Sequence, residues 1–179
     1  MKRLVFVLIF LTFVLTSVAA QQAAAELSFT FTNQRGFASN QFAAWIEDAQ
    51  GRHVKTLYAT RFTANGGWKR RPTSIPVWVM QSGISEMSKA QVDALSSATP
   101  KTGPLSYKWD GTDSRGTAMP AGNYVLFLEG TLRAQSQVLY RAPIQLGQGA
   151  GTARVSVEYT GNSNAERSMI GDVKVQVLR

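Results

Sequence analysis

Few residues of this 179-residue chain have the chemistry of a catalytic nucleophile or a general base. His53 is the only histidine, and the chain contains no cysteine, which excludes thiolate nucleophiles, zinc thiolates and iron–sulfur clusters. A catalytic triad or a metal site would depend on this one imidazole, which we expect half exposed on a strand. Glu129 is expected on another strand, either buried and paired with Arg70 or Arg71, or solvated. We expect no enzymatic activity, and a hydrolase is the weaker alternative.

A second group of residues has the chemistry of ligand binding. The segment NGGWKRRPTSIPVWV combines Trp68 and Trp78 with Lys69, Arg70 and Arg71. Guanidinium groups and an indole face would suit a flat anionic ligand through charge-assisted hydrogen bonds and stacking. The alternative is a long loop closing over one end of the domain, with its tryptophans in the core and its charges in water. We treat Trp68, Arg70 and Arg71 as a hypothetical ligand loop.

A run of small and hydroxyl residues, DALSSATPKTG, could carry a modification. DALSSAT resembles the D-x-x-[ST]-G-A-[ST] motif through which exported proteins receive covalent flavin mononucleotide (FMN) from a flavin transferase. Asp93, Ser96, Ala98 and the acceptor Thr99 match the motif position by position, whereas Ser97 replaces its glycine. A threonine hydroxyl is a weak nucleophile, so the activating base and metal would belong to the transferase. The alternative is an ordinary helix exit into a Pro-Gly loop.

The N-terminal residues have the pattern of a secretory signal. Lys2 and Arg3 precede a long apolar run that ends in small residues, which predicts a helical signal peptide over 1–20 and an exported, periplasmic protein. Cleavage after Ala25 and an uncleaved anchor are alternatives. Residues 21–25, rich in Gln and Ala, are expected to form a flexible tether.

Length and charge limit what the rest of the chain can be. Residues 26–179 have the size of one domain with a single core, and without cysteine its stability must come from buried apolar surface. The formal net charge is +8, and it falls by two when the signal is removed. Most basic residues are scattered, so we expect solvated charges and, in an exported protein, no nucleic-acid partner.

Short runs with a two-residue hydrophobic period predict the fold class. Leu27, Phe29 and Phe31 alternate with polar residues, as in a strand with one buried face. Two β-rich runs around Gln50-Gly51 predict a hairpin. At least seven such runs, without long amphipathic helices between them, predict an all-β fold, an antiparallel immunoglobulin-like sandwich.

Helical patterns are confined to a central insertion, residues 65–104. Ser88 and Gln91 have the spacing of a capping box, which predicts a helix of about two turns from Ser88 to Leu95. One further turn is expected within RRPTSIPVWVMQSG, where Pro72 and Pro76 limit helix growth.

The segment YKWDGTDSRGTAMPAGNY resembles an element of immunoglobulin-like domains such as that of the flagellar hook-capping protein, where it joins two strands across a sandwich edge. Trp109 is expected in the core, and Asp110 and Asp113 are expected to accept backbone hydrogen bonds in Asx-turns. Gly111 and Gly116 allow tight reversals. A calcium loop is the alternative, but the acidic residues do not follow the alternating calcium-loop pattern.

The chain as a whole resembles the predicted periplasmic family DUF2271. The resemblance rests on the signal and on the segments FAAWIEDAQGRHVKTLY, GGWKRRPTSIPVW, DALSSATPKTG and WDGTDSRGTAMPAGNY, in this order. The resemblance implies a location outside the cytoplasm and, through neighbouring PepSY membrane proteins and flavin transferases, a flavin-linked redox setting. We therefore expect a non-catalytic binding or accessory protein without a metal or resident cofactor and without stable membrane insertion after signal cleavage. The alternative is a covalent FMN carrier modified at Thr99.

Overall fold

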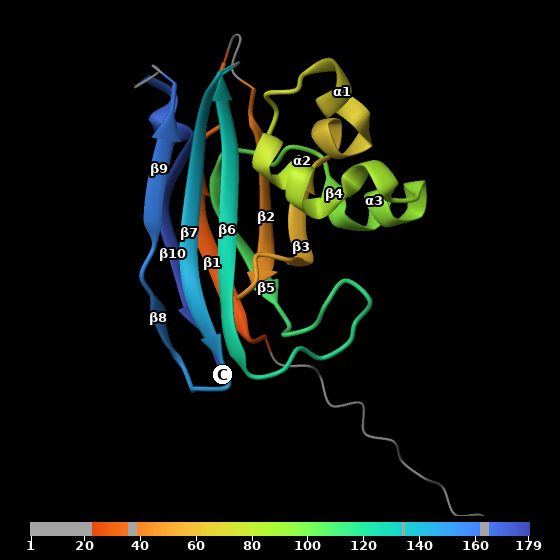
Figure 1. The fold of residues 1–179 in the computed structure, drawn as a ribbon. Helices are drawn as coiled ribbons and strands as arrows, with labels where there is room; N and C mark the ends of the chain where they lie inside the picture. The colour runs from red at the N-terminus through yellow and green to blue at the C-terminus, as the bar shows by residue number, and fades with distance from the viewer. Residues whose placement is uncertain (1–22, 36–38, 134, 162–164) are drawn as a thin grey trace, which may run out of the picture.

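Two facing β-sheets form the body of the protein (Figure 1). The computed structural model describes residues 23–35, 39–133, 135–161 and 165–179. The predicted signal peptide, residues 1–20, lies outside the described residues. The predicted antiparallel sandwich is confirmed, with a helical insertion added on one side.

The first sheet has four antiparallel strands in the order β5-β1-β10-β8. Their bounds are Ala25–Phe31 for β1, Gly103–Trp109 for β5, Gly151–Ala153 for β8 and Ile170–Val177 for β10. Leu27, Phe29 and Phe31 of β1 are buried, while the residues between them are half-buried, as their alternation predicted. The sheet therefore presents one apolar face to its partner.

The second sheet has six strands in the order β4-β3-β2-β6-β7-β9. Their bounds are Gln41–Asp48 for β2, His53–Thr60 for β3, Ser96–Ser97 for β4, Gly122–Arg133 for β6, Ser136–Leu146 for β7 and Ser156–Thr160 for β9. All pairs are antiparallel except β3 with the two-residue β4. The predicted hairpin joins β2 to β3, and Gly51 takes the positive φ of +74° that its turn requires.

The main core fills the space between the sheets. Phe42 of β2 lies at its centre and packs against Phe29, Phe31 and Tyr58, with ring centroids 4.7–5.6 Å apart. Each large apolar side chain buried in this way contributes about 1.5–3 kcal/mol. This core accounts for the stability of a domain that has no disulfide.

The predicted tether, residues 21–25, is wrong at its C-terminal end. Ala24 and Ala25 are fully buried, and Ala25 is the first residue of β1. The Ala24 amide donates to the Trp109 carbonyl at 2.7 Å, and its own carbonyl accepts from Leu178 at 2.8 Å. Ala24 and Ala25 therefore belong to the folded domain.

The loop between β5 and β6 carries the chain from one sheet to the other. Trp109 is fully buried and its indole donates to the Thr112 carbonyl at 2.8 Å. Asp110 Oδ1 accepts from the Thr112 amide at 3.0 Å, and Asp113 Oδ1 accepts from two backbone amides at 2.8 and 2.9 Å. The predicted core tryptophan and Asx-turns are confirmed.

The insertion between β3 and β5 is more helical than predicted. It contains α1 (Trp68–Arg70), α2 (Pro76–Ser82) and α3 (Lys89–Leu95), with a π-helical segment Thr63–Gly67 before them and a 3₁₀ turn Ile84–Glu86 between α2 and α3. Outside the insertion, a 3₁₀ turn, Ala165–Met169, precedes β10. The capping box of Ser88 and Gln91 is confirmed at the start of α3. Pro76 does not limit α2 but begins it, since a proline suits the first helical position.

The insertion covers the outer face of the six-stranded sheet instead of closing over one end of the sandwich (Figure 1). A second apolar cluster forms there, with Trp45 of β2 and Trp78 of α2 both fully buried. Trp45 also stacks on Phe127 of β6 at 4.9 Å. Strand β2 is consequently buried on both faces, which a two-residue alternation does not predict.

Gly130 of β6 lies where the main core leaves no room for a side chain. A Cβ atom at this position would lie 2.6 Å from Ile170 Cδ1 and 3.0 Å from Met169 Cε. We expect Gly130→Ala to lower the free energy of unfolding by about 1–3 kcal/mol through overpacking. Gly171→Ala is the matched control because a Cβ there meets no atom within 4 Å. Equal effects of the two substitutions in urea unfolding would contradict this packing.

Candidate functional site

A groove of about 540 Å³ is larger than two other cavities in the described part of the chain, which measure about 250 and 140 Å³. It lies between α3, strands β3 and β5, and the loop that follows Trp109. We call it the basic groove, and it is lined by His53, Lys55, Thr56, Leu57, Met87, Gln91, Ala94, Leu95, Lys108, Ser114 and Arg115. Its size lies within the range of small-molecule binding sites.

The charged side chains that line the groove are all positive. Lys55, Lys108 and Arg115 line it, and no carboxylate does. Lys55 is held by Asp110, whose two carboxylate oxygens lie 2.9 and 3.0 Å from its Nζ. Lys108 and Arg115 are exposed, so they can turn toward an anion in the groove. The wall formed by Met87 and Leu95 is apolar, which suits a ligand with one anionic and one apolar part.

His53 contributes a neutral side chain to this groove. Its Nε2 lies 2.9 Å from Thr56 Oγ1, which also accepts from the Trp78 indole at 3.0 Å. Burial lowers the pKa of His53 to about 4, so the imidazole is uncharged at neutral pH. Such a ring is a weak general base, and it can offer a ligand hydrogen bonds without adding charge.

Glu129 of β6 is buried beneath the insertion, with 1% of its surface exposed. Its carboxylate accepts from the backbone amides of Val77 at 3.1 Å and Trp78 at 2.8 Å, in the first turn of α2. The expected ion pair with Arg70 or Arg71 is therefore wrong, because backbone donors take the place of arginine. Burial raises the pKa of Glu129 to about 7, although the two backbone hydrogen bonds oppose this rise.

The chain enters α2 through a strained residue. Ile75 has φ = 41° and ψ = 59°, a left-handed conformation that is costly for a β-branched side chain. Its amide donates to Thr131 Oγ1 at 2.7 Å, and Thr131 in turn donates to the Thr73 carbonyl at 3.0 Å. Side chains of β6 thus hold both the entry and the first turn of α2.

A chain of hydrogen bonds links this support to the groove. It runs from Glu129 to the amide of Trp78, from the Trp78 indole to Thr56, and from Thr56 to His53. Thr56 and His53 line the groove, whereas Trp78 and Glu129 do not. Helix α2 therefore positions one wall of the groove without touching its interior.

The hypothetical ligand loop lies elsewhere. Trp68 is half-buried against the second apolar cluster, with Lys69 Nζ 5.4 Å from its ring centre. The guanidinium groups of Arg70 and Arg71 lie 5.5 and 5.2 Å from the ring centre of Phe62. None of these residues lines the basic groove or either of the two smaller cavities.

The segment that resembles a flavinylation motif follows the groove along the chain. Asp93 forms an ion pair with Lys89 on α3, and Ser96 is buried in β4. Thr99 is exposed in the stretch after β4, where the Ala98 carbonyl accepts from the Tyr58 hydroxyl at 3.0 Å. The motif residues therefore adjoin the groove through α3, but Thr99 does not line it.

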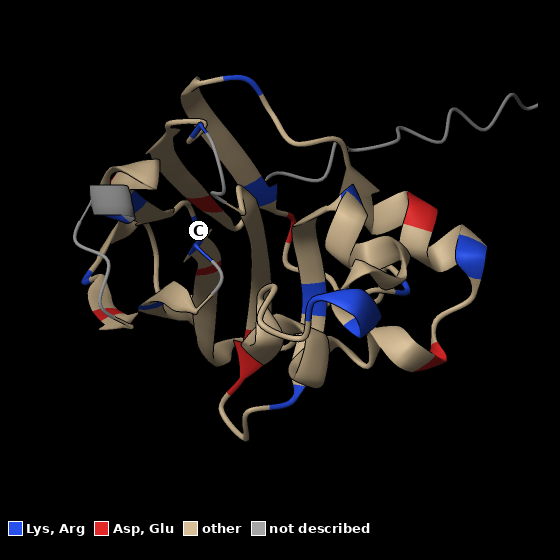
Figure 2. Ribbon diagram, turned by 90° about the horizontal axis from the view of Figure 1, so that it is seen from above, with Lys and Arg blue, Asp and Glu red and all other residues tan. Residues whose placement is uncertain are grey.

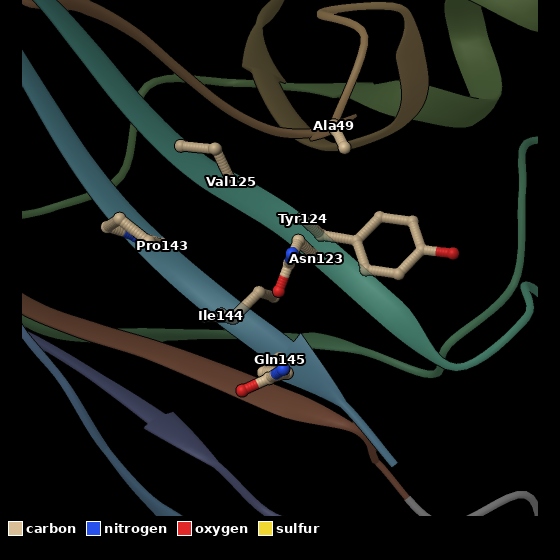
Figure 3. A pocket seen from close by; sticks show the side chains of 7 residues that line it. All are labelled: Ala49, Asn123, Tyr124, Val125, Pro143, Ile144 and Gln145. Atoms are coloured by element: carbon tan, nitrogen blue, oxygen red, sulfur yellow. The ribbon is translucent and has the colours of Figure 1, made fainter. Parts of the chain in front are cut away.

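A second cavity lies between strands β6 and β7 near the β2–β3 hairpin (Figure 3). It measures about 250 Å³, and Figure 3 shows it bordered by Ala49, Asn123, Tyr124, Val125, Pro143, Ile144 and Gln145. These residues include no Lys, Arg, Asp or Glu. The second cavity therefore lacks the cationic side chains that make the basic groove the better candidate for a ligand site.

Among the described residues, no three His, Asp or Glu side chains gather in a way that could hold a metal ion. Across the same part of the chain, no helix is long and apolar enough to cross a membrane.

The model of one protein family, described as "Predicted periplasmic protein (DUF2271)", matches residues 22–165. The chain belongs to this family. It is accordingly a periplasmic protein, and the match includes the insertion, the basic groove and the loop after Trp109. No curated protein and no solved structure matches the chain.

Sequence reasoning missed the groove as a site. Gln91 belongs to the capping box and Lys108 and Arg115 to the YKWDGTDSRGTAMPAGNY segment, and only the fold brings these two segments together. The one available signal was the position of Lys108 and Arg115 in or beside the WDGTDSRG segment, which we interpreted as structural.

Glu129 predicts a pH dependence of stability. Because its pKa is about 7 in the folded protein and 4.5 ordinarily, the folded state binds the proton more tightly. The resulting stabilisation is complete below about pH 4.5 and is lost as the pH rises through about 7, by up to about 3 kcal/mol. We expect Glu129→Gln to remove this component, so the difference in unfolding free energy between variant and wild type should change between pH 4.5 and 7. A difference independent of pH would contradict the buried, protonatable carboxyl.

Proposed function

We propose that this protein is a non-catalytic periplasmic binding or accessory protein that holds an anionic, partly apolar ligand in the basic groove. The observation that carries the proposal is a groove of about 540 Å³ with three cationic side chains in its lining and no carboxylate. Lys108 and Arg115 would form charge-assisted hydrogen bonds with the anionic group. The apolar wall of Met87 and Leu95 would cover the rest of the ligand.

The finer proposal is that the protein serves a flavin-linked redox system outside the cytoplasm. It is supported by the family resemblance, and FMN has the chemistry that the groove suits, a phosphate joined to a flat ring system. A PepSY-type membrane redox protein and a flavin transferase are the partners that this setting implies. In this role the protein needs no chemistry of its own.

A hydrolase has less support. His53, with a pKa of about 4, is a weak general base, and its neighbour Thr56 already accepts a hydrogen bond from Trp78. Turnover by the purified protein that depended on His53 or Glu129 would overturn the non-catalytic proposal.

Binding of FMN to the purified protein tests the groove directly. We expect flavin fluorescence to titrate to saturation, and each of Lys108→Gln and Arg115→Gln to weaken binding about tenfold through loss of a charge-assisted hydrogen bond. Lys174→Gln is the matched control because Lys174 is exposed on β10, outside the groove. Riboflavin, which lacks the phosphate, should bind more weakly than FMN. Equal losses for all three variants would show that only net charge matters and would contradict a site in the groove.

The second candidate function is a covalent FMN carrier. It is favoured by one observation, the exposure of Thr99 on the chain that leaves β4, where a transferase could reach it. The transferase would use a flavin dinucleotide as donor. Thr99 Oγ1 would form a phosphodiester with the phosphate of the FMN part, the pyrophosphate bond of the donor would break, and the nucleoside monophosphate would leave. The hydroxyl proton would pass to the base of the transferase. The ligand loop Trp68, Arg70 and Arg71 would then shield the flavin ring.

Coexpression of the exported protein with a flavin transferase tests this candidate. The carrier hypothesis predicts an FMN adduct by intact mass and in-gel fluorescence, its loss in Thr99→Val and its retention in Thr102→Val, a matched control at another exposed threonine. No adduct beside a positive control substrate would eliminate the carrier. An adduct that persists in Thr99→Val would show that the acceptor is a different residue.

A further inference from the structure

One end of the insertion carries a cluster of exposed cations around an aromatic ring. We call it the cationic patch and define it by Arg61, Phe62, Lys69, Arg70 and Arg71. All five residues are exposed, and Phe62, with 36% of its surface in solvent, is one of four large apolar side chains exposed among the described residues. Figure 2 looks down on this end of the molecule and shows α1 largely in blue.

The patch is not neutralised by the protein itself. The sequence from residue 61 to residue 82 contains four basic residues and no acidic one. In the part of the chain that the structure describes, no ion pair involves Arg61, Lys69, Arg70 or Arg71. Their positive charge is therefore available to an anionic partner, and it is concentrated, whereas most other basic residues are scattered.

The geometry around Phe62 gives the patch an amphipathic form. The guanidinium groups of Arg70 and Arg71 lie 5.5 and 5.2 Å from the ring centre, within the range of cation–π contacts. Gly67 lies against Phe62, because a Cβ there would be 2.7 Å from the ring atom Cδ1, so the ring has a defined position. The patch therefore combines an exposed aromatic ring with two guanidinium groups beside it.

We propose that the cationic patch docks the protein on the surface of a bilayer that contains anionic phospholipids. At such a surface the guanidinium and ammonium groups meet phosphates, while the ring enters the boundary between headgroups and acyl chains. The ring distinguishes a bilayer from an acidic protein surface, which would need the charges alone. The proposal does not depend on what the groove binds, because no patch residue lines the groove.

Docking would also leave the groove accessible. Its lining comes from β3, β5, α3, the stretch before α3 and the loop after Trp109, whereas the patch belongs to α1 and the residues on either side of it. In Figure 1, α1 lies at the end of the molecule away from the labelled C-terminus and from the loop between β5 and β6. A ligand bound in the groove could therefore be presented close to the membrane surface.

Vesicle sedimentation tests the proposal with the full exported domain. We expect binding to vesicles of phosphatidylcholine and phosphatidylglycerol in equal amounts, and much less to phosphatidylcholine alone. Each cation near an anionic surface strengthens binding about fivefold, so the triple variant Arg61→Gln, Lys69→Gln, Arg70→Gln should bind on the order of a hundredfold more weakly. Arg71 is left intact because it also donates to Ser39 Oγ at 3.3 Å.

A matched triple variant separates the patch from net charge. Lys101→Gln, Arg154→Gln and Lys174→Gln remove the same charge from exposed positions outside the patch. We expect this variant to retain most of the binding. Equal losses in the two triple variants would overturn the proposal in favour of diffuse attraction. Circular dichroism of both variants establishes that they are folded.

Trp68 provides a second, local measurement. It adjoins the patch and is half-buried, whereas Trp45, Trp78 and Trp109 are fully buried. Brominated phosphatidylcholine in the anionic vesicles should therefore quench Trp68 on binding, and Trp68→Phe should abolish the quenching while the protein still sediments. Binding without quenching would overturn a docked patch, and capture of polyglutamate without vesicle binding would indicate an acidic protein partner instead.

Discussion

The structure depends on one buried interaction, the contact between the Glu129 carboxylate and the first turn of α2. Without the insertion, Trp45 and its apolar neighbours on the outer face of the six-stranded sheet would be exposed to water. Glu129 holds α2 over that face, and Thr131 fixes the strained entry at Ile75. Burying a carboxyl is costly, but its hydrogen bonds to two backbone amides specify the position of α2 in a way that apolar contacts alone do not.

The candidate site is a consequence of this arrangement. Trp78 reaches from α2 to Thr56, and Thr56 orients His53 in the groove wall. Helix α3, which follows α2, supplies the opposite wall with Gln91 and Leu95. The sandwich is thus a rigid support, and the groove lies where the insertion and the loop after Trp109 meet it. The proposed binding function resides in these added segments and not in the sheets.

The fold could be predicted from the sequence where local patterns determine structure. The alternation in β1, the Gly51 turn, the capping box at Ser88 and the Asx-turns after Trp109 all depend on neighbouring residues, and all are confirmed. The place where the insertion packs was harder to predict. Strand β2 is buried on both faces because the insertion covers its outer side, and such a strand has no two-residue alternation. The partner of Glu129 was predicted wrongly because backbone amides have no signature in the sequence, whereas arginines do. The groove required Lys108 and Gln91 to meet across the fold, which no local pattern encodes.

Hydrogen exchange of the Val77 and Trp78 amides, followed by NMR, tests the role of Glu129 most directly. If the carboxylate holds α2 in place, both amides exchange slowly in the wild-type protein and much faster in a Glu129→Ala variant, and the His53 ring resonances shift with them. The amides of β1 and β10, in the other sheet, should keep their protection. Slow exchange at Val77 and Trp78 in both proteins would contradict the account, because another interaction would then hold the insertion on the sheet.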